Sequence, residues 1–258
     1  MRHVRVIPVL LLHKGGLVKS VKFKNYRYVG DPINAVKIFN EKEIDEIVVL
    51  DIDAGRDQRG PDMDQIKDIA GEAFIPLAYG GGISTIDEVK KLFYLGIEKV
   101  ILNFQAHANP SLITEAARLV GSQSVVVSID VKKNLFGKNK VYVKNGTEGI
   151  GKDPLEFALA MQEAGAGEIF LNSIDRDGTY RGYDLPLIKE LSQALRIPLI
   201  ACGGASSIDD FGSAIGAGAS AVAAGSMFVF QRPHNAVLIS YPSRKDLKEK
   251  VYSVPRKQ

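Results

Sequence analysis

An internal repeat constrains this chain more than any other feature of its sequence. Residues 75–87 read IPLAYGGGISTID and residues 197–209 read IPLIACGGASSID, a match at a constant offset of 122 residues (197 − 75 and 209 − 87). Each copy is an apolar run, then glycines, then a pair that can open a helix, Ser84-Thr85 or Ser206-Ser207. Asp53, Arg59 and Gly60 recur as Asp175, Arg181 and Gly182 at the same offset. The sequence therefore predicts two similar halves.

Short β-branched runs alternate with amphipathic segments along the chain. Strands are expected at residues 5–12, 46–52, 75–79, 99–102, 124–131, 168–172, 197–201 and 221–224. Helices are expected at residues 32–40, 64–73, 86–95, 110–119, 154–164, 185–195 and 208–215. Apolar strands separated by helices indicate a parallel sheet. Eight strands in about 230 residues fit an α/β protein of the (β/α)8 TIM-barrel type, built of two fused half-barrels, whereas an open doubly wound sheet does not predict the repeat.

Composition and length bound the remaining possibilities. We expect residues 1–230 to form the barrel and residues 231–258 to form a C-terminal helix and basic tail of the same single domain. The net charge of +3 is too small to argue for a nucleic-acid partner. The single cysteine excludes an internal disulfide, and no apolar run is long enough to cross a bilayer. A cytoplasmic protein without membrane insertion is predicted.

Glycines gather at the predicted carboxyl ends of strands, where backbone amides can hold an anion. One such cradle is expected in each half. The first comprises Gly81, Gly82 and Asn103, and the second comprises Gly203, Gly204, Gly225 and Ser226. Two cradles predict a ligand with a phosphate at each end, a bis-phosphate or a phosphosugar.

Charged residues at the same strand ends are candidates for chemistry, because active sites of such barrels lie at that face. Asp130 ends a buried run, so its carboxylate is either functional or paired with a neighbour, and we favour function. Asp51 ends another strand. Asp177 and Gly178 form either a charged turn or part of a site beside the second cradle. Lys19 lies in an expected loop at residues 15–24, where a mobile lysine could close over a phosphate or could simply be solvated.

The predicted strand starts carry a second set of charges: Arg5, Glu46, Lys99 and Glu168. All four fall at the N-terminal mouth of the barrel, where charges normally serve stability. A ring of alternating charge is also what a gate needs. Cys202 is expected to fill a tight turn, and the four histidines lack metal-ligand spacing, so no metal and no cofactor are predicted.

Several of these segments resemble HisF, the cyclase subunit of imidazole glycerol phosphate synthase. The most specific are residues 173–179, SIDRDGT, with Gly182, Tyr183 and Asp184; the related isomerase HisA shares the duplication but lacks this ending in this form. The resemblance implies a barrel of the ribulose-phosphate-binding type and a lyase reaction in histidine biosynthesis. It also implies a glutaminase partner, HisH, at the N-terminal mouth, from which ammonia passes through the barrel. Arg5, Glu46, Lys99 and Glu168 match the family's gate.

One position departs from the family. The resemblance implies two catalytic carboxylates at symmetric positions of the two halves, and Asp130 matches one of them. Leu11 stands at the position of the other. Leucine cannot transfer a proton, and losing one of a positioned acid–base pair costs ~10²–10⁴ in rate. His13 falls at the edge of the following loop, so we do not assign it the missing role. Phosphate binding and ammonia passage are therefore expected to survive, and the two-carboxylate chemistry is not.

The second-copy HisF paralogues of surface-polysaccharide clusters are similar in further segments, VKFK at residues 21–24 and AVLISYP at residues 236–242. This resemblance implies a HisH-like glutaminase and, as a further partner, a PP-loop ATP-dependent sugar amidotransferase, which together convert an acetamido group to an acetamidino group in O-antigen biosynthesis. Three hypotheses remain: an ammonia-conducting subunit for sugar amidation, a true histidine-pathway cyclase, and a non-catalytic scaffold that activates the glutaminase. Leu11 favours the first and third over the second, and the intact charged ring favours the first over the third.

Overall fold

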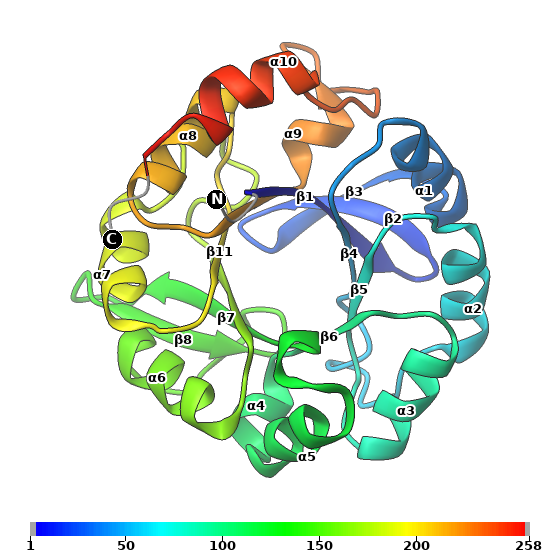
Figure 1. The fold of residues 1–258 in the computed structure, drawn as a ribbon, viewed down its shortest axis with the longest axis vertical. Helices are drawn as coiled ribbons and strands as arrows, with labels where there is room; N and C mark the ends of the chain where they lie inside the picture. Colours follow the sequence, from blue (N-terminus) through cyan, green and yellow to red (C-terminus); the bar gives the residue numbers. More distant parts are fainter. Residues whose placement is uncertain (1–3, 256–258) are drawn as a thin grey trace.

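A closed barrel forms the centre of the molecule (Figure 1). The structure, a computed structural model, describes residues 4–255. Within them eight parallel strands follow one another around the ring: β1 (Arg5–His13), β4 (Ile47–Asp51), β5 (Leu77–Gly80), β6 (Lys99–Leu102), β7 (Val125–Lys133), β10 (Glu168–Ser173), β11 (Leu199–Cys202) and β12 (Ala221–Ala224). Pairing of β12 with β1 and of β7 with β10 closes the ring. The predicted (β/α)8 fold is confirmed.

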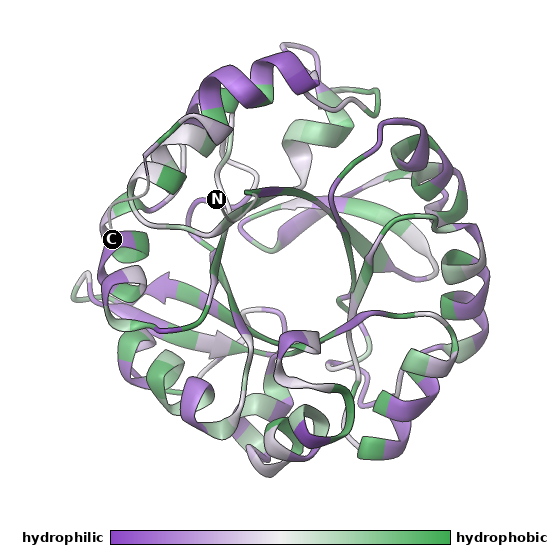
Figure 2. Ribbon diagram, in the orientation of Figure 1, coloured by the Kyte–Doolittle hydropathy of each residue, from purple (hydrophilic) through white to green (hydrophobic). Residues whose placement is uncertain are grey.

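Helices cover the outside of the barrel and begin at the expected signals. The longer helices are α1 (Pro32–Glu41), α2 (Met63–Glu72), α3 (Ile86–Tyr94), α5 (Ser111–Val120), α6 (Pro154–Ala164), α7 (Leu185–Ala194) and α8 (Ile208–Gly216). Asp31, Asp153 and Asp184 cap helices whose first turn contains a proline. Hydrophobic residues of these helices face the strands, and hydrophilic residues face outward (Figure 2). Predicted bounds differ from the observed ones by at most two residues.

The largest differences at the starts of strands have a common cause, a proline just before the strand. Residues 75 and 197 were expected to begin strands, but β5 begins at Leu77 and β11 at Leu199. Pro76 and Pro198 have no amide hydrogen to give to a ladder. Their carbonyls accept hydrogen bonds from Ile47 and Ile169 instead, each at 2.9 Å, so each proline joins only one neighbouring strand.

The predicted two-fold repeat extends to the loops. A strand hairpin follows each of the opposite strands β1 and β7: β2 (Gly16–Val21) with β3 (Lys24–Gly30), and β8 (Asn139–Val143) with β9 (Glu148–Gly149). Short helices α4 (Phe104–Ala108) and α9 (Ser226–Val229) follow β6 and β12. These elements were not predicted, because lysines interrupt the added strands β2 and β8 and the helices α4 and α9 span only five and four residues.

The lumen of the barrel is filled by its own cluster of buried apolar side chains. The members are Ile7, Val9, Val48, Ala78, Ile101, Val126, Phe170, Ile200, Cys202, Ala221 and Ala223, with the half-buried Leu11 and Leu50 packed against them. A second, larger core lies between the strands and the helices. The side chains between the two mouths of the barrel are therefore mostly apolar.

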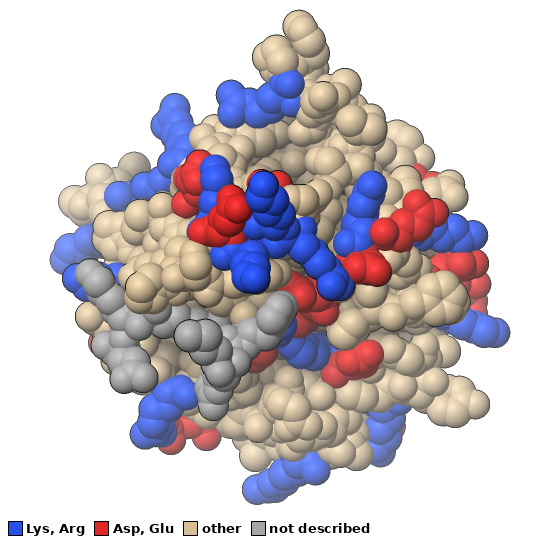
Figure 3. All heavy atoms as spheres, turned by 45° about the horizontal axis from the view of Figure 1, so that its top comes forward, with Lys and Arg blue, Asp and Glu red and all other residues tan. Residues whose placement is uncertain are grey.

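The segment after α9 lies on the outside of the barrel. It contains the short strands β13 (Phe230–Gln231) and β14 (Ala236–Val237), then α10 (Arg244–Leu247) and the helical turn η2 (Lys248–Tyr252), which packs against α8. Figure 3 shows lysines, arginines and acidic residues interspersed on this side of the molecule. Lys250 pairs with Asp209 at 2.9 Å. The last three residues of the expected basic tail, 256–258, lie outside the described residues. Across residues 4–255 we find no helix with the length and apolar character needed to cross a membrane.

Candidate active site at the C-terminal mouth

A cavity of about 360 Å³ opens where the barrel strands end. Predicted site residues that line it are Leu11, Lys19, Asp51, Gly81, Gly82, Asn103, Asp130, Asp177, Gly225 and Ser226. Gly178, Gly203 and Gly204 do not line it. Gly178 packs against Ser20, Gly203 packs against the end of β10 at Ser173, and Gly204 packs against Gly182 in the loop after β10. The structure thus gathers most of the predicted residues around one space.

Asp130 lies on β7 and is buried, and its carboxylate accepts a hydrogen bond from Asn103 Nδ2 at 3.2 Å. Burial first, and then the nearby charge of Asp177, raise the pKa of Asp130 to about 7 against the opposing effect of the Asn103 hydrogen bond. A carboxyl group with a pKa near neutrality can both give and take a proton at physiological pH. Asp130 therefore has the environment of a general acid or base.

Lys19 does not lie in a mobile loop, and that expectation was wrong. It belongs to strand β2, is 4% exposed, and donates a hydrogen bond to the carbonyl oxygen of Val9. Burial lowers the pKa of Lys19 to about 8, with Asp177 opposing the shift, and burial raises the pKa of Asp177 to about 6, with Lys19 opposing it. Pairing of β2 with β1 turns the lysine inward, so this amine is already held at the cavity wall.

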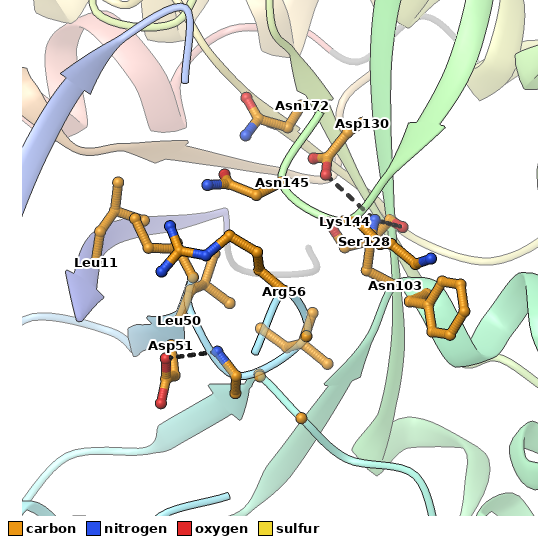
Figure 4. A pocket seen from close by; sticks show the side chains of 18 of the residues that line it. Leu11, Leu50, Asp51, Arg56, Asn103, Ser128, Asp130, Lys144, Asn145 and Asn172 are labelled. Carbon is orange, nitrogen blue, oxygen red and sulfur yellow. Dashed lines mark hydrogen bonds between the residues drawn. The ribbon is translucent and has the colours of Figure 1, made fainter. Parts of the chain in front are cut away.

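Leu11 lies across the cavity from Asp130, as Figure 4 shows. Their strands, β1 and β7, are four places apart in either direction around the eight-stranded ring and are therefore opposite each other. Leu11 pairs in register with Leu50 of β4 and packs against the lumen cluster. The position that the two-fold repeat relates to the Asp130 region is thus apolar, and no proton can be exchanged there.

His13 is held outside the cavity. Its Nδ1 lies 2.8 Å from Asp53 Oδ1, and its ring stacks on Tyr26 with 4.9 Å between centroids. Asp53 also accepts a hydrogen bond from Arg56 at 3.0 Å. Because His13 is not among the residues that line the cavity, it does not replace the carboxylate missing at position 11.

The carboxylate of Asp51 accepts hydrogen bonds from the loop that follows its own strand, β4. Arg59 donates to both of its carboxylate oxygens, at 2.7 and 3.0 Å, and the backbone amides of Asp53 and Ala54 donate to Oδ1 at 3.0 and 3.1 Å. This arrangement fixes the loop after β4 beside the first glycine cradle. The role predicted for Asp51 in ligand binding stays a prediction.

Asn172, which the sequence analysis did not select, also lines the cavity and is paired in register with Asp130. Its side-chain oxygen is buried, and no described residue donates a hydrogen bond to it. An unpaired buried acceptor is costly, and this one lies where a ligand could donate to it. A signal was present in the sequence, since Asn172 ends an apolar strand as Asp130 does. Arg56, Ser128, Lys144 and Asn145 were missed as well, and Figure 4 shows them around the same space.

The two glycine cradles have matching geometry. Gly82 and Gly204, 122 residues apart, both have positive φ angles, of 72° and 107°. A Cβ atom at Gly82 would lie 2.5 Å from the carbonyl oxygen of Arg59, and one at Gly204 would overlap the carbonyl oxygen of Gly182. Only glycine fits at these positions, because both the backbone angle and the space exclude a side chain.

The backbone amides where α3 and α8 begin are not free to hold an anion. The backbone amides of Ser84 and Thr85 donate to Glu88 Oε2 at 2.7 and 2.9 Å. In the second half the amides of Ser206 and Ser207 donate to Asp210 Oδ2 in the same way, at 2.8 and 3.1 Å. These amides are already satisfied by carboxylates of α3 and α8, so an anion in either cradle must use other donors.

The opposite mouth is closed by the charged ring of Arg5, Glu46, Lys99 and Glu168. Arg5 lies 2.5 Å from Glu46 and 2.7 Å from Glu168, and Lys99 lies 2.9 Å from Glu46 and 3.1 Å from Glu168. Each cation thus bridges both acids. Burial lowers the pKa of Arg5, but the two glutamates outweigh it and raise the pKa overall. The structure confirms that these four side chains meet, and their use as a gate stays a prediction.

Comparison with known proteins agrees with this architecture. The family model described as "Histidine biosynthesis protein" matches residues 5–233. The chain is 54% identical to the Pseudomonas aeruginosa protein named "Putative imidazole glycerol phosphate synthase subunit hisF2" over 239 residues, which are 92% of this chain and 95% of the relative. It is 44% identical to the Alkaliphilus metalliredigens imidazole glycerol phosphate synthase subunit HisF over 225 residues, 87% of this chain and 89% of that protein. The chain therefore belongs to the histidine biosynthesis protein family and is similar to its HisF subunits, second-copy forms among them.

Proposed function

We propose that this chain is the HisF-like subunit of a glutamine-dependent amidotransferase complex. It receives ammonia from a HisH-like glutaminase at the charged ring and conducts it through the barrel to the cavity at the other mouth. The acceptor is a sugar whose acetamido group becomes an acetamidino group, with a PP-loop ATP-dependent amidotransferase activating that sugar. The single observation that carries this proposal is Leu11, which stands opposite Asp130 where the cyclase reaction needs a second carboxylate.

The lumen suits neutral ammonia. Its lining between the ring and the cavity is apolar, from Ile7 and Ala221 at one end to Val9 and Cys202 at the other. An ammonium ion would lose its hydration there at high cost, whereas neutral ammonia would not. The closed ring must rearrange for ammonia to enter, so we expect docking of the glutaminase to separate the two cations from the two acids.

The cavity retains the features that would hold a phosphorylated ligand. Lys19 supplies a buried amine, Gly81, Gly82 and Gly225 allow close backbone approach, and Asn172 supplies an unpaired acceptor. In the amidation complex these groups would position a phosphosugar or a phosphorylated effector near the exit for ammonia. In a cyclase they would hold the two phosphates of the ribulosyl–formimino aminoimidazole substrate.

Reconstitution tests the proposal. The chain is purified with the HisH-like glutaminase and the PP-loop amidotransferase of its own organism, and supplied with glutamine, ATP and an acetamido sugar. We expect acetamidino sugar to form only when all three proteins are present. Cyclase turnover by the wild-type chain in the range of an ordinary HisF would restore the histidine-pathway hypothesis. Glutamine hydrolysis without any ammonia transfer would favour the scaffold.

A further inference from the structure

The hairpin that connects β7 to β8 presents two large apolar side chains to solvent. Leu135 is 101% exposed and Phe136 is 87% exposed. We call these two residues the hairpin tip. In Figure 1 the hairpin reaches outward past the ring of helices. The pairing of its two strands starts at Asp130, and β8 ends next to Lys144 and Asn145, so both ends of the hairpin contribute to the wall of the cavity.

The tip is an ordered turn. Asn134 Oδ1 accepts hydrogen bonds from the backbone amides of Phe136 and Lys138, at 2.9 and 3.0 Å. The backbone amide of Asn134 donates to the carbonyl oxygen of Lys138, and the amide of Gly137 donates to the carbonyl oxygen of Asn134, each at 2.9 Å. Gly137 has a φ of 74°. Turn positions of this kind are normally polar. The backbone thus holds Leu135 and Phe136 outward in a fixed arrangement that ordinary turn chemistry does not require.

Lysines surround the tip. This lysine collar comprises Lys132, Lys133, Lys138 and Lys140. Lys132 and Lys140 are directly opposite each other in the antiparallel register, an arrangement in which like charges repel. Within residues 4–255 none of the four forms an ion pair. The collar therefore has positive charge that an acidic surface would neutralise.

A shallow recess of about 280 Å³ adjoins the collar and shares Lys133 with it. Lys22, Arg176 and Arg181 add further positive charge to its lining, against the two acids Asp175 and Asp184. Asp175 accepts a hydrogen bond from the amide of Lys133 at 2.9 Å, and Asp184 caps α7. An apolar tip, a basic collar and a basic recess thus form one continuous surface on the side of the molecule where the cavity opens.

We propose that this surface docks the ATP-dependent amidotransferase through an acidic face that carries an apolar recess. The inference rests on the proposed function. Ammonia leaving the cavity must reach its acceptor before it is protonated in bulk water, so the acceptor protein has to cover this mouth. The glutaminase occupies the other end of the barrel, where Phe74 and Tyr94, 84% and 91% exposed, follow α2 and end α3. Aromatic side chains such as that of Phe136 are enriched at interfaces, and a few anchors buried at the centre provide most of the affinity.

The test measures the Kd between the purified PP-loop amidotransferase of the same organism and the complex of this chain with its glutaminase. L135S/F136S should weaken this binding at least about tenfold while leaving glutaminase binding unchanged. K138E/K140E should also weaken it and should reduce its dependence on salt. L119S removes an exposed apolar side chain from the outer face of α5 and should leave amidotransferase binding unchanged. Thermal unfolding confirms that each variant is folded.

The remaining outcomes separate the inference from the function on which it rests. A tip variant that binds the amidotransferase as tightly as the wild type overturns the docking assignment and leaves the proposed function standing. A wild-type complex that binds no amidotransferase overturns both. Two further results also overturn the assignment: tip-dependent sedimentation with vesicles of phosphatidylcholine and phosphatidylserine, or tip-dependent self-association of the chain in ultracentrifugation, with amidotransferase binding unaffected in either case.

Discussion

The two mouths of the barrel differ in how completely they match what the family implies. At the N-terminal mouth all four charges of the ring are present and each cation contacts both acids. At the C-terminal mouth Asp130 is present and buried, and its pKa is raised to about 7, but Leu11 lies opposite it. We propose from this difference that the passage of ammonia has been kept and that the two-carboxylate reaction has been lost.

Restoring the missing carboxylate at position 11 should cause the largest change in activity. With ammonium salt and the ribulosyl–formimino aminoimidazole substrate, the wild type should turn over at least about a hundredfold more slowly than a two-carboxylate HisF. Leu11→Asp should raise the rate, because Asp130 regains a partner across the cavity. Leu11→Asn, similar in shape but unable to transfer a proton, should stay slow. Equal rates for the two variants would contradict the assignment of position 11.

The burial of Asp130 gives the C-terminal mouth a pH dependence. Because the folded-state pKa is raised to about 7, the folded protein holds this proton more tightly than the unfolded chain does. The resulting stability is present in full below the unfolded pKa and is lost as the pH rises through about 7. Relative to Asp130→Asn, the wild type should lose on the order of 2 kcal/mol of unfolding free energy between pH 5 and pH 8.

Denaturant unfolding at several pH values checks this shift. Asp87→Asn, at an exposed position with a side chain 76% accessible, serves as the control and should follow the wild type. A difference between wild type and Asp130→Asn that does not change with pH would show that the carboxyl group is not protonated in the folded protein at neutral pH.

Removing one cation of the charged ring should have the next largest effect, on the coupling of glutamine hydrolysis to product formation. Lys99→Ala should leave the fold intact, since Arg5 still bridges Glu46 and Glu168. Removing one cation leaves the two acids less balanced, so docking or coupling should weaken. We expect product formed per glutamine hydrolysed to fall several-fold, while activity with added ammonium persists. Lys90→Ala, at an exposed position on α3, should change neither quantity. An unchanged ratio of product to hydrolysed glutamine in Lys99→Ala would show that the charged ring does not couple the two reactions.

The smallest effect concerns the glycine cradles. Crystals soaked in phosphate should show density at both cradles of the wild type, and water alone at both would contradict the two-phosphate ligand. Gly204→Ala should abolish the second site only, because the added methyl group overlaps the carbonyl of Gly182. Gly71→Ala, in α2 with open space around it, should leave both sites occupied.

The sequence was most informative where one residue type has one physical use. Repeated glycines at strand ends and apolar runs of strand length located the barrel and most of the cavity wall. It was least informative where a side chain's use depends on distant pairing. Lys19 was expected in a loop, because only the pairing of β2 with β1 turns it inward. Asn172 lacked the charge that drew attention to Asp130, and the carboxylates of Glu88 and Asp210 occupy amides that the local sequence left free.

Isotope competition tests the link between the two mouths most directly. The reconstituted complex receives glutamine labelled with ¹⁵N in its amide group together with an equal concentration of unlabelled ammonium, and the isotope in the product is measured by mass spectrometry. If ammonia passes through the lumen from the ring to the cavity, the product should carry almost only ¹⁵N. Product nitrogen in the ratio of the mixed pool in solution would show that ammonia escapes to solvent, and would contradict conduction through this barrel.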